Sequence, residues 1–415
     1  MSELRNCVLV CFLLFASQMA GALPNAWIAT WAASPQTGLP DPKEPLRKID
    51  NQTVRERVRV SVGGSRICLR LSNEYGSTPL LVGAVTVAEP VDPATVKPTS
   101  TRTVTFSGQK SVTIPGGAPM VSDPVEFPVT SGEEISISLY FPRRVSTPTL
   151  HGLALKRAVV SQQGDQTRAE KIEGGALSKS SIALSAVLVP AQPAHHLVVA
   201  FGDSIVDGDG SSLDADRNWP SDLVRRLEKA SKGSKVAVVN EGIIGNRLLS
   251  DGEGFGASAL ARFDRDVLAQ PGLTHIVLLE GINDIAFPGA RLNGECLADP
   301  SEARAPQDLI AAYRQLITRA HSHGIKLIGA TLTPFEGVVF AQDYYTESKE
   351  ATRQAVNQWI RTSGAFDAVI DFDGVVRDPD HPTRLLPRFA SKDHLHPNDA
   401  GYEAMANAID VSLFK

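Results

Sequence analysis

The hydrophobic pattern of this 415-residue chain changes near residue 190, and the change limits what the chain can fold into. Before that point, apolar and polar residues alternate in short runs, most cleanly in residues 134–141 (EISISLYF). Such runs of period two, separated by turn signals such as Gly63-Gly64, are typical of antiparallel strands that bury one face. We therefore expect residues 23–190 to form an all-β domain of the sandwich or jelly-roll kind.

A proline-containing linker at residues 190–194 leads into a different pattern, in which apolar runs alternate with helical stretches. The expected strands are residues 197–201, 236–239, 275–279, 326–331 and 368–372, and the expected helices are residues 220–230, 257–268, 306–323, 348–362 and 398–413. Continuously apolar strands indicate a parallel sheet that is covered on both faces, and strand–helix alternation indicates a doubly wound α/β fold. We expect residues 195–415 to form this second domain around a flavodoxin-like sheet.

The composition excludes several classes of partner and cofactor. With 42% hydrophobic and 21% charged residues, the chain is an ordinary globular protein and not a disordered one. The net charge of −5 and the lack of a Lys/Arg-rich run offer no basic surface to nucleic acid. No cysteine or histidine cluster has the spacing of a zinc site, so we expect no metal.

Residues 1–22 have the pattern of a secretory signal peptide. A positive Arg5 precedes an apolar run at residues 7–16, and the small residues Ala20-Gly21-Ala22 resemble a cleavage site. The run is too short to span a bilayer, so no stable membrane insertion is expected. We expect cleavage after Ala22 and export to the periplasm or the medium, with a buried N-terminal strand or helix as the alternative.

Removal of that segment would leave two cysteines, Cys68 and Cys296, which fall in different expected domains. A disulfide needs close approach of the two Cβ atoms, which sequence alone does not show. We favour two buried free thiols over a disulfide.

Four short motifs follow one another in the second half of the chain. They are Gly202-Asp203-Ser204, Gly242-Ile243-Ile244-Gly245-Asn246, Gly281-Ile282-Asn283-Asp284 and Asp393-His394-Leu395-His396-Pro397. The first three stand at the carboxyl ends of expected strands, where doubly wound folds bind their ligands, and the fourth lies in the loop after the fifth strand. We expect all four motifs to meet at one edge of the sheet.

Together the motifs contain the groups that serine-dependent acyl transfer needs. Ser204 is the expected nucleophile and His396 the base that takes its proton. Asp393 can bind Nδ1 of the imidazole and leave Nε2 free for the serine. The backbone N–H groups of Ser204 and Gly245 and the side-chain amide of Asn283 are the expected oxyanion donors. Because each motif alone is weak evidence, and a turn or a helix cap explains each of them as well or better, the prediction depends on all four.

The order Ser, Gly, Asn and Asp-x-x-His resembles the SGNH (GDSL-type) hydrolase family, over residues from about 195 to 415. The resemblance implies a serine carboxylic-ester hydrolase without a cofactor, and it assigns the same catalytic and oxyanion roles to the residues named above. Two positions differ from the family pattern. Ile205 replaces the usual Leu, and Asn246 stands where many relatives carry Asp, which puts the contacts of position 246 in question.

The opening Trp27-Ile28-Ala29-Thr30-Trp31-Ala32-Ala33-Ser34-Pro35, ahead of a β domain, resembles a subgroup that includes acetyl xylan esterases. This resemblance implies cleavage of short-acyl esters, acetyl esters above all, on small molecules or carbohydrate. No strongly apolar lid segment is evident, which disfavours long-chain lipids. A lipase, arylesterase or thioesterase of the same mechanism is the alternative.

Two further hypotheses belong to other classes of function. A metal- or carboxylate-dependent hydrolase would use Asp371, Asp373, His394 and His396, although a strand end explains the two aspartates as well. A non-catalytic carbohydrate-binding or scaffold protein would use the β domain, and the intact set of catalytic residues argues against it. Neither the oligomeric state nor the role of the β domain can be inferred from the sequence.

Overall fold

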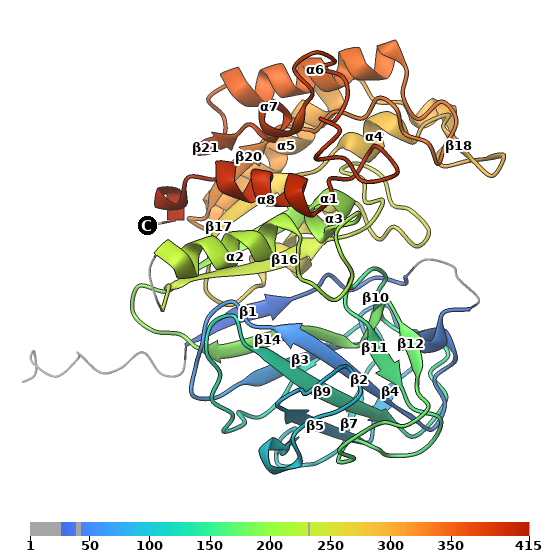
Figure 1. Ribbon diagram of the computed structural model, residues 1–415, viewed down its shortest axis with the longest axis vertical. Coiled ribbons are helices and arrows are strands. Elements are labelled where there is room, and N and C mark those ends of the chain that lie inside the picture. The colour runs from blue at the N-terminus through green and yellow to red at the C-terminus, as the bar shows by residue number, and fades with distance from the viewer. Residues whose placement is uncertain (1–25, 39–42, 231–232, 415) are drawn as a thin grey trace, which may run out of the picture.

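The computed structural model describes residues 26–38, 43–230 and 233–414. The expected signal peptide, with Cys7, Cys11 and the cleavage site at Ala22, lies outside the described residues. Figure 1 shows two bodies stacked along the long axis of the molecule, one built of strands and one of strands and helices. We call them the β region (residues 26–190) and the α/β region (residues 196–414).

The β region is built from short strands. They are β1 (Trp27–Ala32), β2 (Gln52–Arg59), β3 (Cys68–Ser72), β4 (Leu80–Val82), β5 (Ala84–Ala88), β6 (Arg102–Val104), β7 (Val112–Ile114), β8 (Pro119–Val121), β9 (Glu134–Phe141), β10 (Leu150–His151), β11 (Ala158–Val160), β12 (Ala176–Ser178), β13 (Ser181–Ile182) and β14 (Leu184–Pro190), with 3₁₀ turns at Pro45–Lys48 and Pro98–Ser100. Among the described residues, the larger sheets have the orders β1-β14-β3-β8 and β12-β11-β2-β9-β5-β6, and all their pairings are antiparallel. The period-two runs therefore became antiparallel strands, as expected.

Strand β2 has buried residues on both faces, whereas a strand in a surface sheet usually exposes one face to solvent. Arg55 and Glu56, which point to opposite faces, are both buried. The Arg55 side chain donates hydrogen bonds to Ser138 Oγ and to the backbone oxygens of Ala94 and Ala169. Loops therefore cover the polar face of this strand, because their carbonyl oxygens satisfy the buried guanidinium.

The α/β region surrounds a parallel sheet of five strands in the order β16-β15-β17-β20-β21. The strands are β15 (His196–Gly202), β16 (Val236–Gly242), β17 (Leu273–Leu279), β20 (Lys326–Ala330) and β21 (Ala368–Ile370), and the hairpin β18 (Arg291–Leu292) and β19 (Glu295–Cys296) projects from them. The helices are α1 (Ser204–Asp207), α2 (Trp219–Ala230), α3 (Ala259–Arg262), which continues as a π-helical turn over Phe263–Leu268, α4 (Ile282–Ala286), α5 (Pro306–Ser322), α6 (Glu347–Thr362), α7 (Phe372–Val376) and α8 (Asp399–Ala408), with 3₁₀ turns at Pro300–Glu302 and Val411–Phe414.

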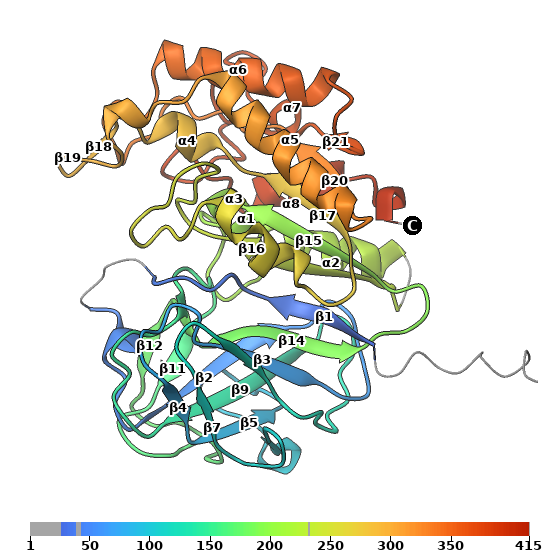
Figure 2. The same cartoon turned by 180° about the vertical axis from the view of Figure 1, so that it is seen from behind.

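Helices cover both faces of the parallel sheet. Helices α2 and α8 pack together on one face (Figure 1), and α3 and α5 lie on the other face (Figure 2). In chain order the strands run second, first, third, fourth and fifth across the sheet, which is the doubly wound order of flavodoxin-like folds. The carboxyl ends of β15, β16 and β17 therefore lie side by side.

The two regions meet where β1 packs against β16, the edge strand of the parallel sheet. At one end of this contact, four basic side chains of the β region hold two aspartates in the loop after α1. Asp214 accepts from Arg57 and Arg157, and Asp216 accepts from Arg59 and Lys156, at distances of 2.5 to 3.2 Å. The β region thus anchors the loop that leads away from α1.

The two cysteines of the described residues are both free, but only Cys68 is buried. Burial raises the pKa of the Cys68 thiol to about 11. Cys296 lies on strand β19 of the projecting hairpin and is exposed, so the expectation of two buried thiols is wrong for Cys296. Among the helices of the described residues, none combines the length and the apolar character needed to cross a membrane.

Candidate active site

Ser204 stands at the first position of α1, directly after strand β15. The chain turns at Gly202, where a Cβ would overlap the carbonyl oxygen of Leu279 in the neighbouring strand, so a larger residue does not fit. Asp203 caps α1 because its Oδ1 accepts a hydrogen bond from the Ile205 N–H at 2.9 Å. The sharp turn and the cap place the hydroxyl of Ser204 at the carboxyl end of the sheet.

His396 and Asp393 complete a hydrogen-bonded chain with Ser204. The His396 Nε2 lies 2.8 Å from Ser204 Oγ, and its Nδ1 lies 2.6 Å from Asp393 Oδ2. The other oxygen of Asp393 accepts from the backbone N–H groups of Leu395 and His396 at 2.8 and 2.9 Å. The carboxylate is therefore fixed in place, and the imidazole can accept a proton from the serine hydroxyl.

The surroundings of His396 favour the imidazolium form. Burial lowers the pKa of His396, but the hydrogen bond to Asp393 and the charges of Asp209, Asp393 and Asp203 outweigh burial and raise it above its ordinary value. Asp209 Oδ2 lies 3.7 Å from Nδ1, on the loop after α1. Burial raises the pKa of Asp393, but hydrogen bonds to His396 and its positive charge dominate and hold this pKa well below its usual range. Asp209 is a contributor that the sequence motifs did not single out.

The expected oxyanion donors lie beside this chain of hydrogen bonds, on the neighbouring strand ends. Gly245 has φ of +70°, and a Cβ there would overlap the ring of Phe255. Asn283, in the first turn of α4, donates one amide hydrogen to the backbone oxygen of Asn246 at 2.9 Å, while its Oδ1 accepts from the Tyr344 hydroxyl at 3.0 Å. Because these two bonds fix which way the amide faces, its second N–H remains for a developing negative charge. The sequence placed Tyr344 only at the rim and did not predict this contact.

The side chain of Asn246 makes hydrogen bonds that an aspartate at this position could not make. Asn246 Nδ2 donates to the backbone oxygens of Phe255 and Ala257 at 2.7 and 2.9 Å. Its Oδ1 accepts from Arg262 Nε at 2.9 Å. A carboxylate would lack the two donated bonds, so the amide is what joins the Gly245 turn to the segment around Phe255.

Arg262 is a buried residue beneath the site that was not predicted to take part. Its guanidinium donates to the carbonyl oxygens of Gly202 and Glu241, both at 2.8 Å, and stacks on the ring of Phe201 at 4.2 Å. A signal was present in the sequence, because Arg262 and Asp266 share the helical spacing of the buried residues Ala259, Phe263 and Val267. A charged pair on an apolar helical face predicts a buried polar network.

The network beneath the site extends into the β region. Ser34, from the Trp-rich opening segment, accepts a hydrogen bond from Arg262 at 2.9 Å and donates one to Glu241 Oε2 at 2.6 Å. His151 binds the Ser34 backbone oxygen through Nδ1 at 3.0 Å and lies 3.2 Å from Asp207 Oδ1 through Nε2. The end of α1 and the end of β16 are therefore both held by side chains of the β region.

The residues of the metal-dependent hypothesis do not form a common site. His394 is exposed with φ of +61°. Asp371 and Asp373 accept from Arg361, and Asp373 also accepts from Arg353 at 2.7 Å. Both carboxylates are therefore ion-paired with arginine side chains. Throughout residues 26–38, 43–230 and 233–414, no group of three or more His, Cys, Asp or Glu side chains could hold a metal ion.

The comparisons with known proteins concern the α/β region. Residues 200–404 match the model of the GDSL-like lipase/acylhydrolase family. Solved structures that resemble the chain include a variant of an acetyl xylan esterase from Geobacillus stearothermophilus, with 22% identity, coverage of 52% of this chain and 92% of that one, and a TM-score of 0.38. A GDSL-like lipase from Bacteroides thetaiotaomicron has 18% identity, coverage of 51% and 84%, and a TM-score of 0.37. No curated protein sequence matches the chain.

Proposed function

Because residues 200–404 belong to the GDSL-like lipase/acylhydrolase family of carboxylic ester hydrolases, we propose that Ser204, His396 and Asp393 cleave esters through an acyl-serine intermediate. One observation carries this assignment. The His396 ring bridges the Ser204 hydroxyl at 2.8 Å and the Asp393 carboxylate at 2.6 Å, which is the arrangement of nucleophile, base and orienting group.

The reaction runs in two halves. Ser204 Oγ attacks the ester carbonyl carbon while its proton passes to His396 Nε2, and the oxyanion accepts hydrogen bonds from the N–H groups of Ser204 and Gly245 and from Asn283 Nδ2. The bond from the carbonyl carbon to the alkoxy oxygen breaks, and His396 gives its proton to the leaving alcohol. Water, deprotonated by His396, then attacks the acyl-serine and releases the acid and the free serine.

The proposed substrate carries a short acyl group, acetyl above all, on a small molecule or a carbohydrate. Aromatic rings support this choice, because Phe255 covers Gly245 and stands 5.5 Å from the ring of Phe287, which stands 6.1 Å from Tyr344. Rings packed in this way leave little room beside the Gly245 donor. A lipase, arylesterase or thioesterase of the same mechanism is the second candidate, favoured by the exposed apolar pair Val339 and Phe340.

The domain and export assignments complete the proposal. Residues 1–22 serve as a signal peptide cleaved after Ala22, residues 23–190 form a β domain, and residues 195–415 form the hydrolase domain. The antiparallel sheets of the β region and the parallel sheet of the α/β region support the division. Because an exported enzyme meets esters outside the cytoplasm, the proposed substrate is extracellular or periplasmic.

Hydrolysis of p-nitrophenyl esters from acetate to palmitate tests the substrate proposal. We expect kcat/KM to be highest for acetate or butyrate and to fall steeply with longer chains, because Phe255 packs against Gly245, an expected oxyanion donor. Acetylated xylan is the next substrate to test, with release of acetate as the measurement. A maximum at palmitate would contradict the short-acyl proposal and favour a lipase.

The pH dependence of turnover should report the charges beside His396. The base works only when neutral, so we expect kcat/KM to fall as the pH falls through the raised pKa of His396, with a midpoint above about 6.5. Replacing Asp209 by asparagine removes a negative charge 3.7 Å from Nδ1 and should move this acid limb to lower pH. A pH–rate profile of both proteins measures the shift, and identical midpoints would contradict the role given to Asp209.

A further inference from the structure

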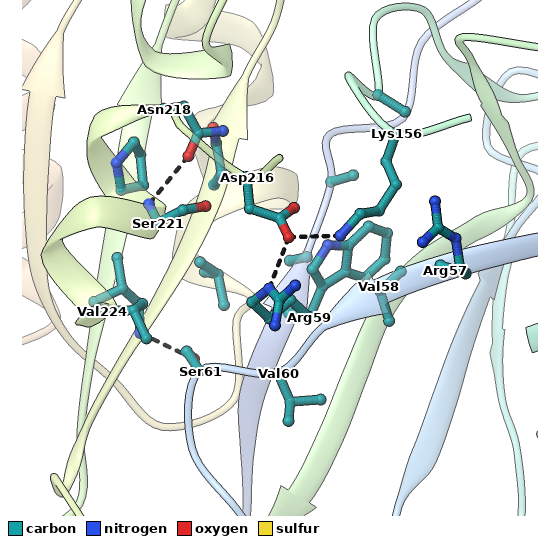
Figure 3. Close-up of a pocket in the computed structure, with 18 of the residues that line it drawn as sticks. Arg57, Val58, Arg59, Val60, Ser61, Lys156, Asp216, Asn218, Ser221 and Val224 are labelled. Atoms are coloured by element: carbon teal, nitrogen blue, oxygen red, sulfur yellow. Dashed lines mark hydrogen bonds and ion pairs between the residues drawn. The ribbon is translucent and has the colours of Figure 1, made fainter. Parts of the chain in front are cut away.

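A cavity of about 390 Å³ lies between the β region and the α/β region (Figure 3). Strands β1 and β2 line it from one side, and the end of α1, the start of α2 and strand β16 line it from the other. Asp207 is among the lining residues, whereas Ser204, His396 and Asp393 are not. The cavity is therefore separate from the acyl-serine site, although both touch α1. Its volume and its place between two regions are typical of small-molecule sites.

Several residues that line this cavity carry buried polar atoms without a protein partner. Glu56, Asp207 and Ser181 are 3%, 5% and 6% exposed, and each leaves one oxygen without a hydrogen bond. Arg57, which also lines the cavity, leaves its Nε without an acceptor. An unpaired buried polar atom costs roughly 1–3 kcal/mol, so a ligand that supplied hydrogen-bonding partners to these residues would be stabilised in the cavity.

Most of the charged side chains around the cavity are paired with one another. Figure 3 shows Asp216 between Lys156 and Arg59, at 2.6 and 2.7 Å. His151 lies against Asp207, and burial raises the pKa of Glu56 to about 8, so this carboxyl is protonated and uncharged at neutral pH. Among the buried lining residues Glu56, Lys156 and Asp207, an ionic ligand would find no unpaired opposite charge. Glu228 of α2 also lines the cavity, is not buried and forms no ion pair with a described residue. A ligand that both donates and accepts hydrogen bonds would find partners for both.

The cavity also has an apolar wall. Trp31, half-buried in β1, lines it together with Val58 and Val60 of β2. An indole ring beside groups that donate and accept suits a ring-shaped ligand with C–H groups on one side and hydroxyls around its edge. Sugars have this combination, and an uncharged sugar also meets the charge balance.

We propose that the interdomain cavity binds an uncharged sugar unit at a site distinct from the acyl-serine site. Trp31 receives the apolar face of the sugar, and Glu56, Ser181, Asp207 and Arg57 hydrogen-bond its hydroxyls. Because Asp207 ends the helix that begins at Ser204, the bound sugar contacts the element that carries the nucleophile. The proposal concerns binding alone and does not depend on which ester the enzyme cleaves.

Isothermal titration of the full mature protein with D-xylose, D-glucose and xylobiose tests the proposal. We expect saturable binding of at least one of them, unchanged after Ser204 is blocked with a phosphonate, because Ser204 does not line the cavity. Glu56→Leu should weaken binding about tenfold, whereas the matched variant Glu56→Gln, which keeps both hydrogen-bonding atoms, should bind like the wild type.

A second variant keeps the proposal testable if Glu56→Leu fails to fold. Trp31→Ala removes the apolar wall at a half-buried position, and it should also weaken sugar binding about tenfold while the thermal unfolding profile stays cooperative. Failure of all three sugars to bind the wild type would overturn the proposal and leave water as the occupant. Loss of binding on phosphonate treatment, or full binding by both Glu56→Leu and Trp31→Ala, would overturn it equally.

Discussion

Replacement of Ser204 by alanine is expected to lower kcat for ester hydrolysis by about a million-fold, because the reaction loses the atom that forms the covalent intermediate. The fold should be unaffected, since the hydrogen bond from Ser204 Oγ runs to His396, whose imidazole keeps its bond to Asp393. Initial rates with p-nitrophenyl acetate and the thermal midpoint measure the two effects. Full activity in this variant would remove the acyl-serine mechanism.

Two further variants show whether the loss of activity comes from loss of the nucleophile, and not from removing any hydroxyl or any single oxyanion donor. Ser212→Ala changes an exposed serine in the loop after α1, which donates to Asp399 and not to the triad, and it should keep nearly full activity. Asn283→Ala removes one of three oxyanion donors and should lower kcat by about 10²–10³. The expected order of activity is therefore wild type and Ser212→Ala, then Asn283→Ala, then Ser204→Ala.

The parallel sheet and the meeting of the motifs could be predicted because both depend on local patterns. Strand β17 was expected at residues 275–279 and covers Leu273–Leu279, since a strand buried on both faces is a continuous apolar run. The carboxyl ends of such strands share one edge of the sheet, and this brings Gly245 and Asn283 toward Ser204. His396 could be added because its motif follows the fifth strand.

The network beneath the site could not be predicted in the same way, because its partners are far apart in sequence. Ser34 and Arg262 are separated by 228 positions, and no periodicity pairs a loop residue of one region with a helix residue of another. The same holds for Arg55, which alternation alone would have placed on the solvent face of β2 beside Arg57 and Arg59, and whose partners Ala94 and Ala169 are distant in sequence. The exposure of Cys296 depends on a hairpin of two-residue strands that carries no hydrophobic pattern.

Replacement of Arg262 by methionine is expected to destabilise the protein by about 3–5 kcal/mol, because one partner of a buried ion pair disappears. Methionine retains much of the apolar volume over Phe201 but leaves the carbonyl oxygens of Gly202 and Glu241 without their donor. Urea unfolding, followed by fluorescence, measures the change in the free energy of unfolding. Unfolding in two steps is also expected, since the bond from Arg262 to Ser34 joins the α/β region to the β region.

Arg265→Met is the matched control, because Arg265 also pairs with Asp266 but its side chain is 27% exposed. Water can hydrate the Asp266 carboxylate in part when the guanidinium of Arg265 is removed. Arg265→Met should therefore lower the free energy of unfolding clearly less than Arg262→Met. In the folded fraction, Arg262→Met should lower kcat more than it changes KM, since Arg262 holds Asn246, which in turn fixes Asn283 and the Gly245 turn. Arg265 also reaches the β region, through Tyr75 and Pro35, so the two variants differ in the burial of the lost charge. Equal stability would contradict the larger cost assigned to the buried Arg262, and equal kcat would mean that Arg262 does not position the oxyanion donors.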